Sequence, residues 1–215
     1  MTTHPYSDGF IVSFWEKIFK VLSYISIFYY VSLIRKRITS KNNYLFVEYW
    51  VIGNLICSIC ASLIAYNFPS NILAIALSAY GILRIFEIVV YQTNVMLFDS
   101  YRALKEGREY VIKSPTRLVI LLLHNYVEII FWFTTVTISY LNIENLETSS
   151  WFYYLHMNFK CITTFDISEI LSNITNRSPY LLIAFFESVI GFLMTIISLA
   201  RFIGLLPQVK SIEKI

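Results

Sequence analysis

Hydroxyl and carboxylate side chains lie close together in the segment KCITTFDISE, toward the C-terminal end of the chain. Thr163 and Thr164 supply paired hydroxyls, and Asp166 and Glu169 supply carboxylates shortly after them. Rings of such oxygens, one set from each subunit of an oligomer, can contact a cation in an aqueous pore. These four residues, with Phe165 between them, are therefore the candidate filter-like residues of an ion pore.

Lys160 lies one helical turn before the two threonines, where a buried ammonium group needs a partner. Asp166 is the obvious candidate. If the two side chains pair behind the turn, Asp166 is a structural strut. If they do not, Asp166 is an ion ligand at the outer mouth of the pore, and the sequence leaves both alternatives open.

The composition indicates an integral membrane protein. Of 215 residues, 57% are hydrophobic and only 14% are charged, which leaves too little polar surface for a water-soluble globule. The net charge of +3 is small, so nucleic acid is not an expected partner. No nucleophile elbow, phosphate-binding glycine loop or paired metal-binding histidine motif is present, so we expect neither an enzyme nor a bound metal or cofactor.

Four apolar runs are long enough to cross a bilayer, which takes roughly 20 helical residues. Each run is bounded by charged residues, proline or polar turns. The predicted fold class is an all-α membrane protein with four to five transmembrane helices. The four runs are Tyr44–Asn67, Ile72–Phe98, Leu118–Leu141 and Tyr180–Leu206.

A fifth apolar run, Phe10–Ile34, is interrupted by charges near its start. It spans the membrane if Glu16 and Lys20, at the favourable four-residue spacing, partly neutralise each other. Otherwise its first part is an amphipathic helix at the membrane surface. The sequence leaves these alternatives open.

The distribution of basic residues predicts the orientation. Segments 35–43 and 99–117 are rich in lysine and arginine, and Lys210 and Lys214 lie in the tail, whereas the connection 142–178 is acidic. Basic loops stay in the cytoplasm, so we expect a multi-pass protein of the cell membrane with a cytoplasmic C-terminus. The basic segments are also expected to contact membrane lipids, including anionic ones.

The acidic outer connection contains an apolar segment, Trp151–Ile162, preceded by candidate N-caps that include Ser150. This segment is apolar enough to be buried but too short to cross the bilayer. A helix that enters the membrane part-way, turns and returns satisfies both conditions. We therefore expect a re-entrant pore helix and pore loop before the last transmembrane helix.

The order of several short motifs resembles the tetrameric potassium-channel-like pore superfamily, over the stretch Arg117–Leu206. Thr163 and Thr164 match the paired threonines that end the pore helix, and Asp166 with Ile167 resembles the residues after the filter. The inner-helix pattern of that superfamily matches Glu187, Ser188, Gly191 and Arg201.

The resemblance implies a homotetramer and a division of the chain by role. Residues 1–116 would be N-terminal membrane helices with a basic cytoplasmic linker. Residues 117–206 would be the pore domain, with outer helix, pore helix, filter-like turn and inner helix. Residues 207–215 would be a short cytoplasmic tail.

The filter itself departs from the superfamily. Only Phe165 stands between Thr164 and Asp166, so the Gly-Tyr-Gly triplet is missing. Glycine supplies the left-handed backbone of potassium filters, and we expect Phe165, Asp166 and the β-branched Ile167 to be unsuited to it. The prediction is a non-selective, or at least not potassium-selective, cation channel for monovalent or divalent cations. The alternative is a non-conducting membrane scaffold or sensor subunit that retains the pore fold.

Polar side chains inside the apolar runs form a second candidate group, because such groups usually face protein or water. We expect an interhelical clasp in which Arg84 meets Glu87 or Glu128, with Asn54 as a further partner. The functional alternative is a switch sensitive to pH or to a ligand, centred on His124 and Glu128.

Gly191 has two interpretations at this stage. It is either a hinge that lets the inner helices splay during gating, as the resemblance suggests, or a site where two helices pack closely. Cys57 and Cys60 form a Cys-x-x-Cys motif inside an apolar run and are expected to serve packing rather than metal binding, because no second ligand pair accompanies them.

Overall fold

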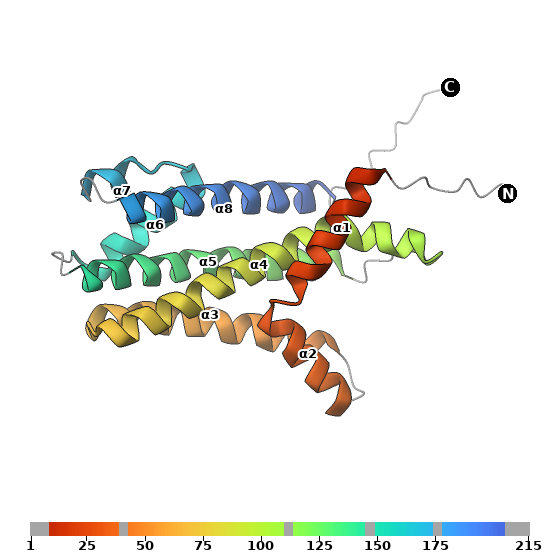
Figure 1. Cartoon of the computed structure of the whole chain (residues 1–215), viewed down its shortest axis with the longest axis horizontal. Helices are drawn as coiled ribbons and strands as arrows, with labels where there is room; N and C mark the ends of the chain where they lie inside the picture. Colours follow the sequence, from red (N-terminus) through yellow and green to blue (C-terminus); the bar gives the residue numbers. More distant parts are fainter. Residues whose placement is uncertain (1–8, 39–42, 110–113, 145–148, 174–177, 205–215) are drawn as a thin grey trace, which may run out of the picture. The chain divides into compact units, whose positions relative to one another are not determined.

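The computed structural model describes residues 9–38, 43–109, 114–144, 149–173 and 178–204 (Figure 1). The regular secondary structure of these residues is entirely helical. The predicted tail at 207–215 and residues 39–42 of the first basic segment lie outside the described residues. The helices are α1 (Phe10–Ser23), α2 (Ile27–Ile38), α3 (Asn43–Asn67), α4 (Asn71–Lys105), α5 (Pro115–Ile143), α6 (Trp151–Thr164), α7 (Ser168–Asn173) and α8 (Ser178–Ile203).

Helices α3, α4, α5 and α8 are each long and apolar enough to cross a membrane. The four strong spans expected from the sequence are thereby confirmed as helices, and the chain is a multi-pass membrane protein. Helix α4 has 35 residues and continues through the polar stretch after Phe98 to Lys105, where Arg102 pairs with Asp99 at 2.8 Å.

The run from Phe10 to Ile34 is not one straight helix. Helices α1 and α2 are bent by 71° at a short break, and the pair counts as a fifth span only if both parts are taken together. The Ser26 hydroxyl accepts the N–H of Tyr29 at 3.3 Å, which caps a new helix at this point. The choice between a spanning and a surface-lying segment stays open.

The chain forms two compact units, and their boundary runs through α4. The first unit comprises residues 1–43 and 83–110, and the second comprises residues 44–82 and 111–215. In the first unit, α1 and α2 pack on the second half of α4. The ring of Phe19 lies 5.6 Å from that of Phe98, and the ring of Phe28 lies 6.0 Å from that of Tyr91.

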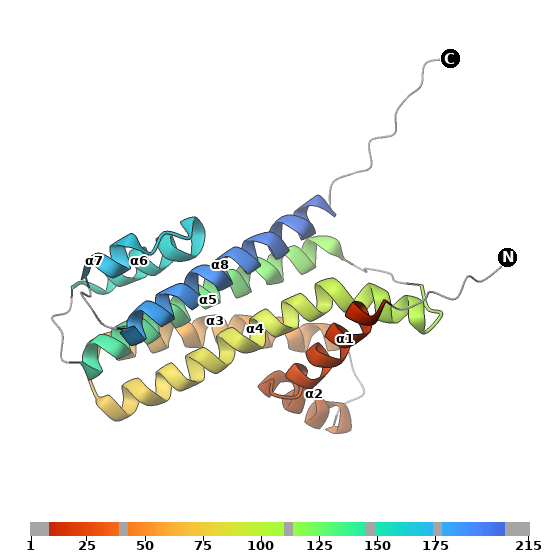
Figure 2. The same cartoon turned by 45° about the horizontal axis from the view of Figure 1, so that its top comes forward.

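In the second unit, α6 packs against both α5 and α8, and α7 follows α6 (Figure 2). Their shared core is apolar apart from a few hydroxyls. It joins the C-terminal ends of α3 and α5 to the N-terminal end of α8. Its buried members are Ala65, Ile138, Leu141, Tyr154, Met157, Cys161, Ile170, Tyr180 and Ala184.

Candidate functional site

Helix α6 has well-defined ends. The Ser150 hydroxyl accepts the N–H of Tyr153 at 3.3 Å, so Ser150 is the N-cap, one of the caps expected from the sequence. At the other end the N–H of Phe165 donates to the carbonyl of Cys161 at 2.9 Å. Phe165 then takes the left-handed conformation, with φ 61° and ψ 17°, which stops the helix and turns the chain.

A chain of hydrogen bonds fixes α6 between its two neighbours. The Tyr180 hydroxyl donates to Thr137 at 3.2 Å, and the Thr137 hydroxyl donates to the side-chain oxygen of Asn158 at 3.1 Å. The amide nitrogen of Asn158 donates in turn to the carbonyl of Tyr154 at 2.7 Å. All these side chains are buried, so the bonds replace water and set the position of α6.

The tip of α6 reaches about half way along its neighbours. Its first residue, Trp151, donates to Ser62 near the C-terminal end of α3 at 3.2 Å. Near its other end, Ile162 contacts Gly191, which lies about 20 Å along α8 from the start of that helix. Tyr126, about 25 Å from the C-terminal end of α5, donates to the Ile162 carbonyl at 3.3 Å.

The inner-helix pattern noted in the sequence is the surface on which this tip rests. The Ser188 hydroxyl donates to the carbonyl of Phe165 at 3.2 Å. A Cβ added to Gly191 would lie 2.9 Å from the Cα of Ile162 and would clash with its carbonyl oxygen. Gly191 is therefore a close-packing residue, and its role as a gating hinge stays a prediction.

Glu187 and Arg201 complete the inner-helix pattern. Glu187 is buried beside the thiol of Cys161, and its Oε1 has no hydrogen-bond partner among the described residues. Arg201 lies near the end of α8. Two of its guanidinium nitrogens, Nε and Nη2, are buried and likewise have no hydrogen-bond partner among the described residues. Both residues therefore have buried polar atoms that the described residues do not hydrogen-bond.

The hydroxyls of Thr163 and Thr164 are engaged within α6. Thr163 donates to the carbonyl of Phe159 at 2.8 Å, and Thr164 donates to that of Lys160 at 2.7 Å. These bonds are common for threonine in helices and leave the hydroxyl oxygens as acceptors. Thr164 is exposed, so its oxygen is accessible from outside the subunit.

Lys160 lies between two carboxylates. Its Nζ is 3.5 Å from Asp166 and 3.3 Å from Glu169. The pairing with Asp166 that the sequence left open is present, and Glu169 is a second partner. Because the paired side chains are exposed and not enclosed behind the turn, the choice between strut and ion ligand stays open. The side chains of Lys160, Asp166 and Glu169 are 38%, 40% and 24% exposed, respectively, so the cluster lies open at the surface of the chain.

The hydrogen bonds of this cluster shift two pKa values in the direction that keeps both groups charged. The hydrogen bond to Glu169 raises the pKa of Lys160 above its usual value. Hydrogen bonds from Ser168, including its N–H at 2.9 Å, hold the pKa of Asp166 below its usual value, with a smaller contribution from Lys160. One ammonium and two carboxylates give the cluster a net charge of −1 at neutral pH.

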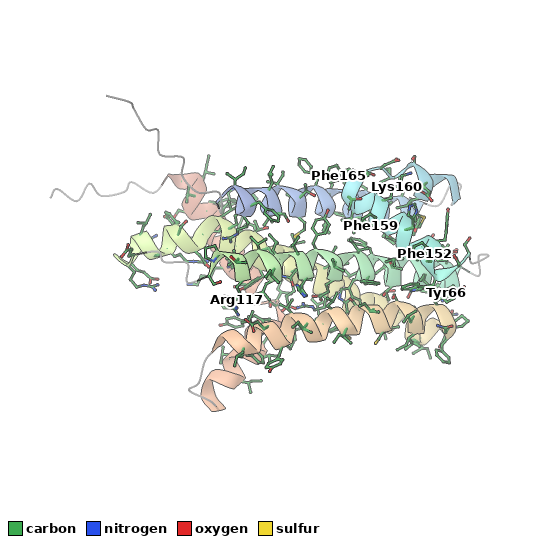
Figure 3. The ribbon with its side chains drawn as sticks, turned by 180° about the vertical axis from the view of Figure 1, so that it is seen from behind. Tyr66, Arg117, Phe152, Phe159, Lys160 and Phe165 are labelled. Atoms are coloured by element: carbon green, nitrogen blue, oxygen red, sulfur yellow. The ribbon has the colours of Figure 1, made fainter. Side chains whose placement is uncertain are left out.

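The exposed side of α6 carries more than charge. Figure 3 shows Phe152, Phe159, Lys160 and Phe165 following α6 from its start to its tip, with Arg117 near the opposite end of α5. Phe152 and Phe159 are both largely exposed, so none of the described elements covers this helix face.

One expectation about the turn was wrong. Phe165 was expected to be unsuited to a left-handed backbone, yet it adopts this conformation. It is the only non-glycine residue with positive φ among the described residues. Contacts with α8 outweigh the intrinsic preference, because Ser188 binds its carbonyl and its ring packs on Phe192 at 5.6 Å. Ile167 keeps a negative φ, and the predicted lack of potassium selectivity stays a prediction.

The intramembrane polar residues divide between the two compact units. In the first unit, Arg84 forms an ion pair with Glu87, one of the two pairings expected, but the pair lies within α4 and does not join two helices. Glu87 also accepts from the Ser26 hydroxyl and, at 2.5 Å, from the N–H of Phe28. Glu87 thus ties the break between α1 and α2 to α4, a role that the sequence did not indicate.

In the second unit, the remaining members of that group have local partners. Glu128 is buried and accepts from the indole of Trp132 at 3.1 Å. Asn54 accepts from the Tyr80 hydroxyl at 3.0 Å, and a ring nitrogen of His124 lies 2.8 Å from the Ile120 carbonyl. The switch expected at His124 and Glu128 stays a prediction.

Comparison of the chain with protein-family models, with curated proteins and with solved structures gives no significant match. The resemblance to potassium-channel-like pores therefore rests on the order of the motifs between Thr163 and Arg201. What the structure adds is how those motifs meet: α6 with its turn on one side and the inner-helix pattern of α8 on the other.

Proposed function

We propose that the chain is a subunit of a homotetrameric cation channel that lacks the Gly-Tyr-Gly filter and does not select potassium. In this proposal α6 is the pore helix, residues 165–167 replace the filter, α5 is the outer helix and α8 is the inner helix. The observation that carries it is the exposed cluster of Lys160, Asp166 and Glu169 at the tip of a helix that ends half way along two spans.

Three charged side chains at that depth are costly if they face hydrocarbon. Charged groups inside a membrane almost always face the protein interior or a water-filled cavity. The same holds for non-helical backbone, such as the turn after Thr164. Four subunits arranged around an aqueous axis satisfy both requirements, because each tip then faces water or a neighbouring subunit instead of lipid.

The charge of the cluster favours cations. Each subunit contributes a net charge of −1, so four subunits place a negative ring at the turn. The C-terminal ends of four α6 helices add partial negative charge in the same place. Without the Gly-Tyr-Gly triplet we expect no cage of carbonyls that replaces the hydration shell of potassium, so sodium and potassium are expected to permeate similarly.

The test combines assembly with permeation. The full chain is purified, its oligomeric state is measured by native mass spectrometry, and currents are recorded in planar bilayers under KCl and NaCl gradients. We expect a tetramer, a reversal potential close to the equilibrium potential of the cation, and a potassium-to-sodium permeability ratio near unity. Anion selectivity, strong potassium selectivity or a monomer would contradict the proposal.

Neutralising Asp166 gives the matching variant. Asp166→Asn removes one negative charge from each subunit and brings the cluster to net zero, so the cation-to-anion permeability ratio should fall toward unity while the tetramer persists. Glu106→Gln is the control, because Glu106 is an exposed carboxylate that pairs with Arg108 and belongs to the other compact unit. A loss of the tetramer in Asp166→Asn alone would instead assign Asp166 to the structural strut.

A non-conducting scaffold or sensor subunit is the second candidate, and one contact favours it. Lys160 engages both carboxylates, so the chain supplies its own cation where a permeant one would bind. A tetramer that stays silent under varied pH, tension and voltage, both in the native protein and in Lys160→Met, would favour this candidate. Conductance that appears in Lys160→Met would show that the passage exists and that the lysine occupies it.

A further inference from the structure

A cavity of about 400 Å³ opens between the beginnings of α3 and α5, at the end of the helices opposite the N-terminus of α6. This volume lies in the lower part of the range of ligand pockets, about 300–1,000 Å³. Its polar lining comes from Glu48 of α3 and from Ser114, Thr116 and Arg117 of α5. Nothing in the proposed channel mechanism uses this cavity.

The lining changes from polar to apolar along the helices. The polar residues lie near the helix ends, and Ile52, Ile120 and Leu121 line the part nearer the middle of the spans. Of the lining residues, His124 lies farthest along α5, and its Nδ1 contacts the carbonyl oxygen of Ile120. A cavity that is polar at the membrane surface and apolar toward the middle matches the build of a lipid, with a headgroup at one end and an acyl chain at the other.

The two charges at the polar end have opposite signs. Nε of Arg117 lies 2.5 Å from a carboxylate oxygen of Glu48, and the two side chains are 30% and 36% exposed. The pair is therefore open to a third group instead of being sealed. A purely anionic headgroup would be attracted by Arg117 and repelled by Glu48, so its net gain would be small.

A headgroup that carries both signs matches both partners. Its phosphate would lie against Arg117 and the N-terminal end of α5, where Ser114 and Thr116 present hydroxyls and the helix dipole favours negative charge. Its ammonium would lie against Glu48. A primary ammonium donates hydrogen bonds to a carboxylate, whereas a fully methylated one has no N–H to donate.

We propose that this cavity binds one glycerophospholipid whose headgroup combines a phosphate with a primary ammonium, as in phosphatidylethanolamine. The headgroup engages Arg117 and Glu48, and part of an acyl chain lies along Ile52, Ile120 and Leu121. The proposal is independent of whether the chain conducts ions. It differs from general attraction of the basic segments to anionic lipid, because it predicts preference for a zwitterionic headgroup with a primary ammonium.

The test uses the full chain in detergent, titrated with short-chain phosphatidylethanolamine, phosphatidylcholine or phosphatidylglycerol and analysed by native mass spectrometry. We expect one phosphatidylethanolamine to bind about tenfold or more tightly than either other lipid, the effect of hydrogen bonds to charged groups. Equal binding of all three lipids, or tightest binding of phosphatidylglycerol, would overturn the proposal.

Variants tie the preference to the ion pair. Glu48→Gln is expected to reduce the preference for phosphatidylethanolamine over phosphatidylcholine by about tenfold. The double variant Glu48→Arg with Arg117→Glu keeps the ion pair, so it protects the fold, but it places a carboxylate where the phosphate binds and should abolish the preference. Arg108→Gln changes an exposed pair that does not line the cavity and belongs to the other compact unit, so it is the control and should leave the preference unchanged. Persistence of the preference in the double variant would overturn the assignment to this cavity.

Discussion

Two charged clusters lie within the apolar part of the chain, and they differ in burial and in balance. In the first compact unit, Arg84 and Glu87 are each 3% exposed, and their charges cancel. In the second unit, Lys160 faces Asp166 and Glu169, the cluster is partly exposed, and one negative charge remains. A sealed and balanced pair serves the fold, whereas an open and unbalanced cluster is available to interact with groups outside the chain.

The partners of each cluster support this distinction. Glu87 accepts from Ser26 and from the N–H of Phe28 and pairs with Arg84, and these partners all belong to the same unit, where they hold the break between α1 and α2. The acids at the tip of α6 bind Lys160 and Ser168 at the surface. If the comparison is right, changes in the first cluster alter stability and changes in the second alter interactions with ions or with other subunits.

The largest expected effect comes from breaking the sealed pair. Arg84→Met leaves the carboxylate of Glu87 buried without its cation, and removal of one member of a buried pair typically costs about 3–5 kcal/mol. The measurement is the free energy of unfolding in detergent, followed by circular dichroism. Arg108→Gln, in an exposed pair, is the control and should change stability by less than about 1 kcal/mol. Equal effects of the two variants would remove the distinction between sealed and open charges.

The next largest expected effect comes from disturbing the contact between the C-terminal end of α6 and Gly191 of α8. Gly191→Ala places a methyl group against the backbone of Ile162, which cannot move aside as a flexible side chain could, so the variant should lose about 1–3 kcal/mol and displace the tip. Gly53→Ala is the matched control, because a Cβ there has nothing within 4 Å. Hydrogen exchange of the amides in residues 161–168 should accelerate in Gly191→Ala only. Unchanged exchange would mean that close packing at Gly191 does not hold the turn.

The elements that hydropathy and local chemistry determine could be predicted from the sequence. The four spans follow from counting apolar residues, and Ser150 follows from N-cap preference. The break between α1 and α2 could not, because it depends on Glu87, which lies about sixty residues away from Ser26. Local propensity gives no information about such a distant partner.

The candidate site was predicted in part. The sequence named Asp166 as the candidate partner of Lys160 but left the pairing open, and it did not indicate Glu169 as a second partner. The hydrogen-bond chain through Thr137, Asn158 and Tyr180 was missed. An asparagine in an otherwise apolar helix is a weak indication of such a bond, and only the packing of α5, α6 and α8 identifies its partners.

Lys160→Met is expected to change stability little and to change cation binding more. The side chain is exposed, so the variant should fold and assemble like the native protein. Each chain then carries both carboxylates without the ammonium of Lys160, and the ring of the proposed channel becomes more negative. Divalent cations should bind more tightly and block monovalent current at lower concentration, which bilayer recording with added calcium measures. If calcium blocked the variant and the native protein at the same concentration, the carboxylates would not face the ion path.

The smallest expected effect is a shift in the titration of Asp166. Its pKa is lowered, so its contribution to stability is present at neutral pH and disappears as the pH falls through the lowered value; the raised pKa of Lys160 removes its own contribution only at alkaline pH. The cluster is therefore intact across the physiological range, and cation preference should weaken only in strong acid. Carboxyl NMR of aspartate-labelled protein reports the midpoint directly. Ser168→Ala removes a principal cause of the shift, so it should raise the Asp166 midpoint more than Lys160→Met does. The reverse order would make the lysine, not the turn, the main stabiliser of the charge, and the open cluster would then resemble the sealed one more closely than its exposure indicates.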